Sequence, residues 1–287
     1  MNKKKKSEYI FKINDNATTI SNFSTNSCFD SGYTETNSSP IDNCIEKINQ
    51  LNLIHTQYLS IPNSTDKLPT VYNLVLLGYI SAIESYIREI VRKIINIDKF
   101  SRIHCEEEEL SYGAAINYPL NLLPEVILEK ASFASKDNII NSFKKYLGLK
   151  GHQPDELLTT LDEFEKICHL RHCIVHRFGK LGSQNAIKFG LDSHSDLIEK
   201  PLKLDVSMVY NLSIICTNTV LVINKYLHNK ILQRTALKES NSWEWDLRKD
   251  KSTFKKYHDL FNSLLKPHPD SSLKNSYDEL KKYYNSQ

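Results

Sequence analysis

The sequence predicts an all-α protein. Only 8 glycines and 9 prolines occur in 287 residues, which favours helix over a turn-rich β fold. Several long segments also carry apolar residues at every third or fourth position, the spacing of one helix face. Apolar residues make up 40% and charged residues 25% of the chain, a balance typical of a soluble domain with a core. This composition excludes collagen, a wholly disordered chain and a disulfide-rich miniprotein.

Residues 1–60 are predicted to form a flexible N-terminal arm that ends in one short helix. Within the arm, residues 14–43 are dominated by Asn, Ser and Thr. Such a segment buries too little apolar surface to offset the entropy lost on ordering. Residues 44–60 are more apolar and predict the short helix. The basic cluster Lys3 to Lys6 is not followed by the apolar stretch of a signal peptide.

Residues 65–232 are predicted to form the central domain, an antiparallel helical bundle. Apolar periodicity and flanking Pro or Gly residues predict helices over 70–97, 121–131, 136–147, 155–178 and 205–230. Residues 180–204 read as a loop or a short hairpin. Residues 206–224 carry no charge, but their Ser, Thr and Asn content favours a buried core helix over a membrane span.

Residues 235–287 are predicted to form a basic helical C-terminal tail with two short amphipathic segments. Between residues 249 and 287 the 8 lysines outnumber the 5 acidic residues and tyrosines are interleaved, a pattern that permits an RNA contact. A tail docked on the bundle is the favoured interpretation.

The charge balance and the cysteines bear on the compartment and on the partners. The formal net charge of +3 and the pI of about 8.4 neither require nor exclude a nucleic-acid partner. The six cysteines include no C-x-x-C pair and no regular spacing, which favours a reducing cytoplasm over secretion. We therefore predict a cytoplasmic protein without a membrane association.

The segment from Cys168 to Arg177 contains three of the ten histidines and carries most of the candidate chemistry. On a helical projection Arg171 falls within or beside an apolar arc, and His172 and His176 lie together on its flank. The apolar arc comprises Leu157, Leu161, Phe164, Cys168 and Val175. A titratable imidazole beside a fixed cation suits phosphodiester cleavage.

A buried arginine needs a counter-charge, and Glu84 on the preceding long helix is a candidate partner for Arg171. Two other interpretations stay open on spacing alone. The histidines can be ordinary surface groups beside an arginine whose head reaches water. Alternatively, Cys168, Cys173 and the histidines can ligate a structural zinc ion, although no second ligand cluster lies at ordinary spacing.

The segment Arg171-His172-Cys173-Ile174-Val175-His176 resembles the R-x4-6-H motif of the HEPN superfamily (higher eukaryotes and prokaryotes nucleotide-binding domains), of the RiboL-PSP-HEPN or MAE-like type. His172 matches the polar residue that commonly follows the arginine. Gly179 matches the glycine that is commonly found shortly after the motif's histidine. The stretch from Ile80 to Glu89 resembles the first long core helix of that family, in which an acidic residue often recurs. The resemblance covers roughly residues 65–232.

The resemblance implies a homodimer in which two such motifs face one composite cleft. It implies a metal-independent endoribonuclease without a cofactor, acting on tRNA or single-stranded RNA in anti-phage defence or as a toxin with an antitoxin or other regulatory partner. Arg171 would stabilise the phosphate, His176 would transfer protons and His172 would support them, with Glu84 a weaker assignment. The products would carry 2′,3′-cyclic phosphate and 5′-OH ends. The alternative is a non-catalytic module that binds nucleotide or RNA or assembles a complex.

Overall fold

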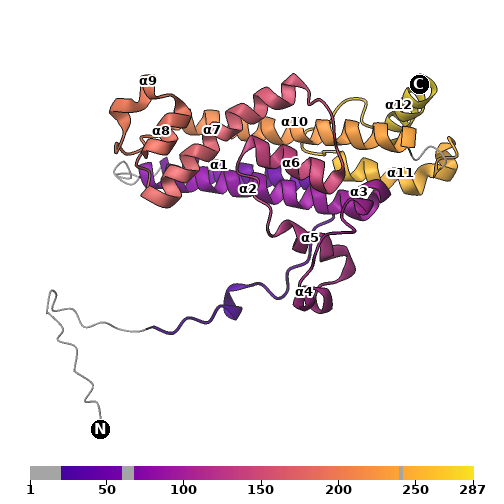
Figure 1. Cartoon of the computed structure of the whole chain (residues 1–287), viewed down its shortest axis with the longest axis horizontal. Coiled ribbons are helices and arrows are strands. Elements are labelled where there is room, and N and C mark those ends of the chain that lie inside the picture. The colour runs from indigo at the N-terminus through magenta and orange to yellow at the C-terminus, as the bar shows by residue number, and fades with distance from the viewer. Residues whose placement is uncertain (1–20, 60–67, 239–241) are drawn as a thin grey trace, which may run out of the picture. The chain divides into compact units, whose positions relative to one another are not determined.

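The computed structural model describes residues 21–59, 68–238 and 242–287, and divides them into two units (Figure 1). The first unit ends at Asn37, and its described part contains one turn of 3-10 helix, η1 (Asn26–Cys28). The second unit extends from Ser38 to Gln287 and is all-α, as predicted. Among the described residues it contains no strand, only one isolated bridge between Lys180 and Pro201.

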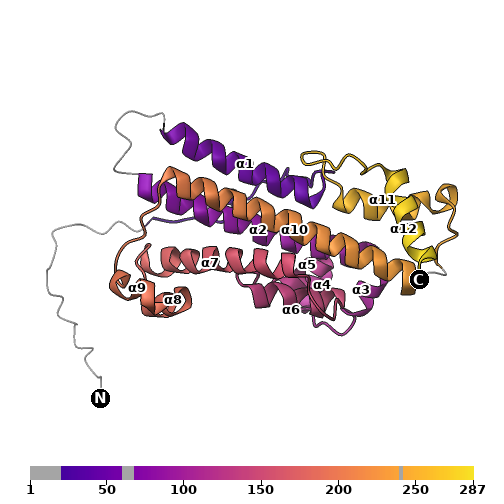
Figure 2. The ribbon, with the colours of Figure 1, turned by 90° about the horizontal axis from the view of Figure 1, so that it is seen from above.

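Four long helices form the bundle: α1 (Pro40–Leu59), α2 (Leu68–Ile97), α7 (Asp155–Arg177) and α10 (Val206–Lys238). Figure 2 shows α10 lying along α2, with α1 on one side of this pair and α7 on the other. The helix over 40–59 thus packs in the bundle, and the compact unit begins at Ser38. This differs from the predicted arm over 1–60, because Ile41, Cys44, Ile45 and Ile48 are buried in the core.

The helix α2 provides the centre of the core. The apolar periodicity that predicted this helix is confirmed, since six residues spaced three or four apart are completely buried: Leu76, Ile80, Ile83, Ile87, Ile90 and Ile94. Burying an aliphatic side chain of this size contributes roughly 1.5–3 kcal/mol. The predicted bounds of 70–97 agree with the observed Leu68–Ile97 to within two residues.

The helix α10 faces α2 with a second buried stripe: Val209, Leu212, Cys216, Val220, Ile223 and Leu227. It extends to Lys238, eight residues beyond the predicted end. Among the described residues it is the one helix whose length and composition would also suit a membrane span, a property shared by core helices of soluble proteins. In this structure it contacts α1, α2 and α7 along its length.

Short helices connect α2 to α7. They are α3 (Lys99–Ile103), α4 (Tyr112–Asn117), η3 (Leu120–Leu122), α5 (Leu123–Leu128) and α6 (Lys136–Leu147). The predicted bounds of the helix over 136–147 are confirmed. Ser135 caps its first turn by accepting a hydrogen bond from the Asn138 amide, and Gly148 ends it in the left-handed conformation.

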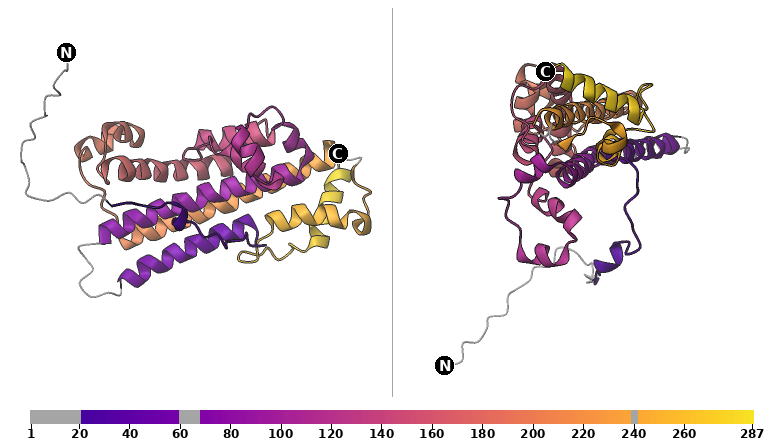
Figure 3. Two further views of the ribbon diagram at one scale, coloured as in Figure 1. Left: turned by 90° about the horizontal axis from the view of Figure 1, so that it is seen from below. Right: turned by 90° about the vertical axis from the view of Figure 1, so that its right-hand side faces the viewer.

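The C-terminal segment forms α11 (Leu247–Phe261) and α12 (Leu273–Asn285), which pack against α10 (Figure 3). Asn224 of α10 donates a hydrogen bond to the Phe261 carbonyl, and the Trp245 and Tyr284 rings stack at 4.0 Å. Asp42 of α1 accepts hydrogen bonds from the Leu264 and Leu265 amides. The two helices predicted in this region are therefore present and are docked on the bundle.

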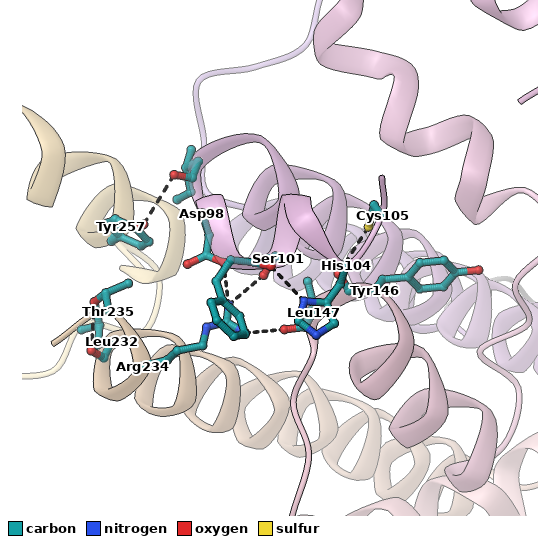
Figure 4. Close-up of polar contacts among 12 residues, drawn as sticks. Asp98, Ser101, His104, Cys105, Tyr146, Leu147, Leu232, Arg234, Thr235 and Tyr257 are labelled. Atoms are coloured by element: carbon teal, nitrogen blue, oxygen red, sulfur yellow. Dashed lines mark hydrogen bonds and ion pairs between the residues drawn. The ribbon is translucent and has the colours of Figure 1, made fainter. Parts of the chain in front are cut away.

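A buried ion pair joins α10 to the junction of α2 and α3 (Figure 4). The guanidinium of Arg234 donates to the Asp98 carboxylate at 2.5 Å, to the Ser101 hydroxyl at 2.8 Å and to the Leu147 carbonyl at the end of α6. It also lies over the Phe100 ring, 4.7 Å from the centroid. Asp98 is completely buried and caps α3 through the Ser101 amide. One side chain thus fixes four segments at this end of the bundle.

Replacing Arg234 by Met should lower the free energy of unfolding by about 3–5 kcal/mol, because Asp98 is left as an uncompensated buried charge. Denaturant titration of the purified variant measures this loss. Adding Asp98→Asn should recover part of it. Lys249→Met, which removes an exposed ion pair with Glu244, is the matched control and should leave stability nearly unchanged. Equal effects of Arg234→Met and the control would contradict the assignment.

Stability should also fall in mildly acidic solution because of His228. Burial lowers the pKa of His228 from 6.5 to about 4, and its ring packs edge-on against Phe261 at 5.3 Å. Between these pH values the unfolded chain binds the proton and the folded chain does not. The free energy of unfolding therefore decreases by up to about 3 kcal/mol as the pH falls. Thermal unfolding from pH 7 to pH 4 measures the slope. His228→Gln should flatten it, whereas the exposed-site variant His152→Gln should not.

Candidate functional site

The helix α7 carries three of the four predicted site residues, and its two ends are sharply defined. Asp155 and Glu156 lie in the first turn, where carboxylates interact favourably with the helix dipole. At the other end Phe178 has φ 51° and Gly179 has φ 92°. The amides of both residues donate to the Cys173 carbonyl. The helix therefore ends at Arg177, one residue before the predicted end, and places His176 in its last turn.

The first four turns of α7 pack against the core as predicted, and in the last two turns the buried face shifts to other residues. Leu157, Leu161, Phe164 and Cys168 are buried, which confirms their predicted stripe. Val175 was expected on the same face and is 51% exposed, so this expectation is wrong. Towards its end the helix buries Cys173 and Ile174 instead. Ile174 belongs to the core cluster, whereas Cys173 is covered by Asn185 of α8 (Ser183–Phe189), which donates to Cys173 Sγ at 3.1 Å.

Arg171 is half-buried, and among the described residues it forms no hydrogen bond and no ion pair. The expected ion pair with Glu84 is not formed, although Glu84 of α2 is also half-buried. Both charges act on the Cys168 thiol, whose pKa rises to about 12 through burial, raised further by Glu84 and lowered by Arg171. The two residues therefore share one neighbourhood without contact, and the guanidinium keeps its donors available.

His172 and His176 form an exposed pair one helical turn apart. Their ring centroids lie 4.4 Å from each other with a tilt of 50°. Both side chains are open to solvent, as is Val175 between them. A donor-rich guanidinium and two imidazoles thus occupy the same two turns of one rigid helix, which is the arrangement that the sequence predicted for Arg171, His172 and His176.

The remaining histidine of the segment, His169, has a different environment. Its ring packs edge-on against Phe189 of α8 at 5.8 Å. Burial lowers its pKa, and the nearby Lys188 and His172 lower it further against an opposing effect of Glu165. The surroundings of His169 therefore favour its neutral form, and its contact with α8 sets it apart from the exposed pair.

Arg177 shows what a structural arginine looks like on the same helix. It donates to Glu199 at 2.5 Å, and its guanidinium covers Gly182, where an added Cβ would lie 2.8 Å from Nη1. The guanidinium of Arg177 thus holds the following loop in place, whereas that of Arg171 forms no hydrogen bond or ion pair among the described residues.

The cysteines and histidines of α7 do not converge on a common point. Cys168 faces the core beside Glu84 and Arg171, whereas Cys173 faces Asn185. Within the described ranges no three His, Cys, Asp or Glu side chains are grouped closely enough to hold a metal ion.

Residues 180–204 hold structure that the sequence did not reveal. The predicted loop or hairpin contains α8, α9 (Leu191–His194) and η4 (Ser195–Leu197). It is closed at its base by hydrogen bonds between residues 179–181 and 199–202, including Leu181 N to the Lys200 carbonyl at 3.0 Å. Between this loop and α7 lies a pocket of about 610 Å³, which we call the α8 pocket. The sequence signal for it was the mixture of apolar and basic residues over 197–203, which includes Leu197, Lys200, Leu202 and Lys203.

Comparisons with family models, with curated proteins and with solved structures find no match to this chain.

Proposed function

We propose that this protein is a metal-independent endoribonuclease of the HEPN type that cleaves RNA by attack of the 2′-OH. The observation that carries the proposal is the unengaged guanidinium of Arg171 within two turns of the exposed His172–His176 pair. An arginine donates up to five hydrogen bonds in a planar array that matches the oxygens of a phosphate. Leaving it without a partner has a cost that a bound phosphate would remove.

The chemistry follows from these three side chains. The His176 imidazole accepts the proton of the ribose 2′-OH as its oxygen attacks the adjacent phosphorus. The bond from phosphorus to the 5′-oxygen breaks, and that oxygen takes a proton from the second imidazole, His172. Arg171 stabilises the charge that builds on the non-bridging oxygens. The products carry a 2′,3′-cyclic phosphate and a 5′-OH, and no metal ion is needed for the proton balance.

The proposed enzyme acts as a homodimer with the two motifs in one cleft. Val175 and Phe178, which flank His176, are 51% and 84% exposed, so an apolar surface adjoins the motif. Exposed apolar surface beside a polar site is typical of an interaction surface. We assign the enzyme to the cytoplasm, which agrees with six cysteines that are all free thiols. The substrates we propose are tRNA or single-stranded RNA, and a defence or toxin role follows only from the resemblance.

His176→Ala should abolish cleavage of total tRNA and of a generic single-stranded RNA in buffer with EDTA. Wild type should leave cyclic-phosphate ends, detected by their resistance to direct ligation and by mass. Arg171→Ala should lower the rate by at least about a hundredfold, since a positioned donor of this type contributes roughly 3–4 kcal/mol to catalysis. His152→Ala, an exposed histidine outside α7, is the control and should cleave like wild type.

The outcomes separate this proposal from the alternative module. Equal cleavage by wild type and His176→Ala would refute the enzyme assignment. Saturable RNA binding that needs Arg171, with no turnover in extract or infected-cell lysate, would indicate a non-catalytic RNA-binding module.

Phe178→Asp should convert the dimer to a monomer and reduce cleavage, because a carboxylate replaces an apolar side chain beside the motif. The fold should tolerate the change, since Asp adopts positive φ more readily than Phe and the side chain is exposed. Light scattering coupled to gel filtration measures the mass. Leu120→Asp, at an equally exposed position of η3, is the matched control. A monomeric wild type would refute the dimer.

A further inference from the structure

The α8 pocket is a built cavity on a different part of α7 from the histidine pair. Leu170 and Cys173 form its α7 wall, and Phe189 and Leu202 contribute from the loop that follows. Its volume of about 610 Å³ lies in the range of small-molecule sites. The cavity is held open by the paired base of the loop and by the hydrogen bond of Asn185 to Cys173. These fixed contacts make the pocket part of the fold.

The charge around the pocket has one sign. Four lysines line it, namely Lys166, Lys188, Lys200 and Lys203, and no carboxylate does. Lys166 pairs with Glu163 at 2.6 Å. Among the described residues the other three lysines form no ion pair. Three uncompensated ammonium groups around a low-dielectric wall attract an anion.

The interior of the pocket is predominantly apolar. Besides Leu170 and Leu202, the wall includes Leu181 and Leu197, and the Phe189 ring contacts the His194 ring at 5.3 Å. An inorganic anion would neutralise the lysines but leave the apolar wall exposed to water. A neutral hydrocarbon would cover the apolar wall but leave the lysines without a counter-charge. Complementarity to both features requires a ligand with an apolar body and an anionic head.

We propose that the α8 pocket binds a small organic phosphomonoester, with its apolar body against the leucines and Phe189 and its phosphate at the lysines. Phosphate is favoured over carboxylate because its second negative charge engages more of the ammonium groups. The proposal is independent of the ribonuclease assignment, since none of Arg171, His172 and His176 lines the pocket.

Isothermal titration calorimetry of the full chain tests the proposal with matched probes. Octyl phosphate and 1-naphthyl phosphate distinguish an aliphatic from an aromatic body. Octanol and 1-naphthol supply the apolar body alone, and inorganic phosphate supplies the anionic head alone. Octanoate carries a carboxylate in place of the phosphate of octyl phosphate. We expect at least one phosphomonoester to bind about tenfold or more tightly than its neutral alcohol, than inorganic phosphate and than the carboxylate.

The double variant Lys188→Gln, Lys200→Gln should weaken phosphomonoester binding about tenfold or more and leave alcohol binding unchanged. Lys249→Gln, Lys255→Gln removes the same net charge from exposed positions on α11 and is the control. A second variant, Leu197→Glu, places a carboxylate at a half-exposed wall position and should abolish binding without unfolding the chain. Circular dichroism verifies the fold of each variant.

Four results would overturn the proposal. The first is binding of inorganic phosphate or of the neutral alcohols as tightly as the phosphomonoesters. The second is equal loss of affinity in the pocket and control lysine variants, which would indicate nonspecific charge attraction. The third is no measurable binding of either phosphomonoester. The fourth is tighter binding of octanoate than of octyl phosphate, because it would show that the pocket prefers a carboxylate to a phosphate.

Discussion

The apolar contact between α2 and α10 is the constraint on which the rest of the molecule depends. Both helices bury a stripe of apolar residues that would be exposed to water in an isolated helix. Apolar packing fixes how close the two helices lie but specifies their longitudinal register only weakly. The ion pair between Arg234 and Asp98 supplies that register at one end, because its charges are tolerated in the interior only in this alignment.

The placement of the candidate site follows from how α7 packs against α2 and α10. Its first turns insert Leu157, Leu161 and Phe164 into the core, which fixes the helix as a rigid rod. Its last two turns bury Ile174 in the core and Cys173 against Asn185 of α8, while His172, Val175 and His176 on the same turns are exposed. Polar side chains on those turns are therefore held by a rigid backbone and still reach solvent. This combination is what a reactive group needs, because precise placement and access usually compete.

The sequence predicted the helices well where one physical signal dominated. The stripe of α2 and the capped helix over 136–147 were found because burial and capping act through residues near in sequence. Val175 was misplaced because the projection assumed one straight buried face, whereas near the end of α7 the buried face shifts to Cys173 and Ile174. The α8 pocket was missed because residues 180–204, which cover α7 near its end, carry no strong helical period. The Arg171–Glu84 pair depends on how α2 and α7 are placed in space, which residue spacing within either helix does not give.

Two neighbouring arginines show why a motif needs its surroundings to be interpreted. Arg171 and Arg177 are identical in chemistry and six residues apart, and from spacing either could bind a phosphate. Arg177 is engaged by Glu199 and covers Gly182, so using it for a ligand would open the loop. Arg171 can accept an anion with no rearrangement of the described structure. Preorganised, unengaged donors are favoured for stabilising developing charge, because no existing interaction has to be broken. The environment of Arg171 therefore favours an anion there, and the resemblance of the motif suggests the reaction that this environment would serve.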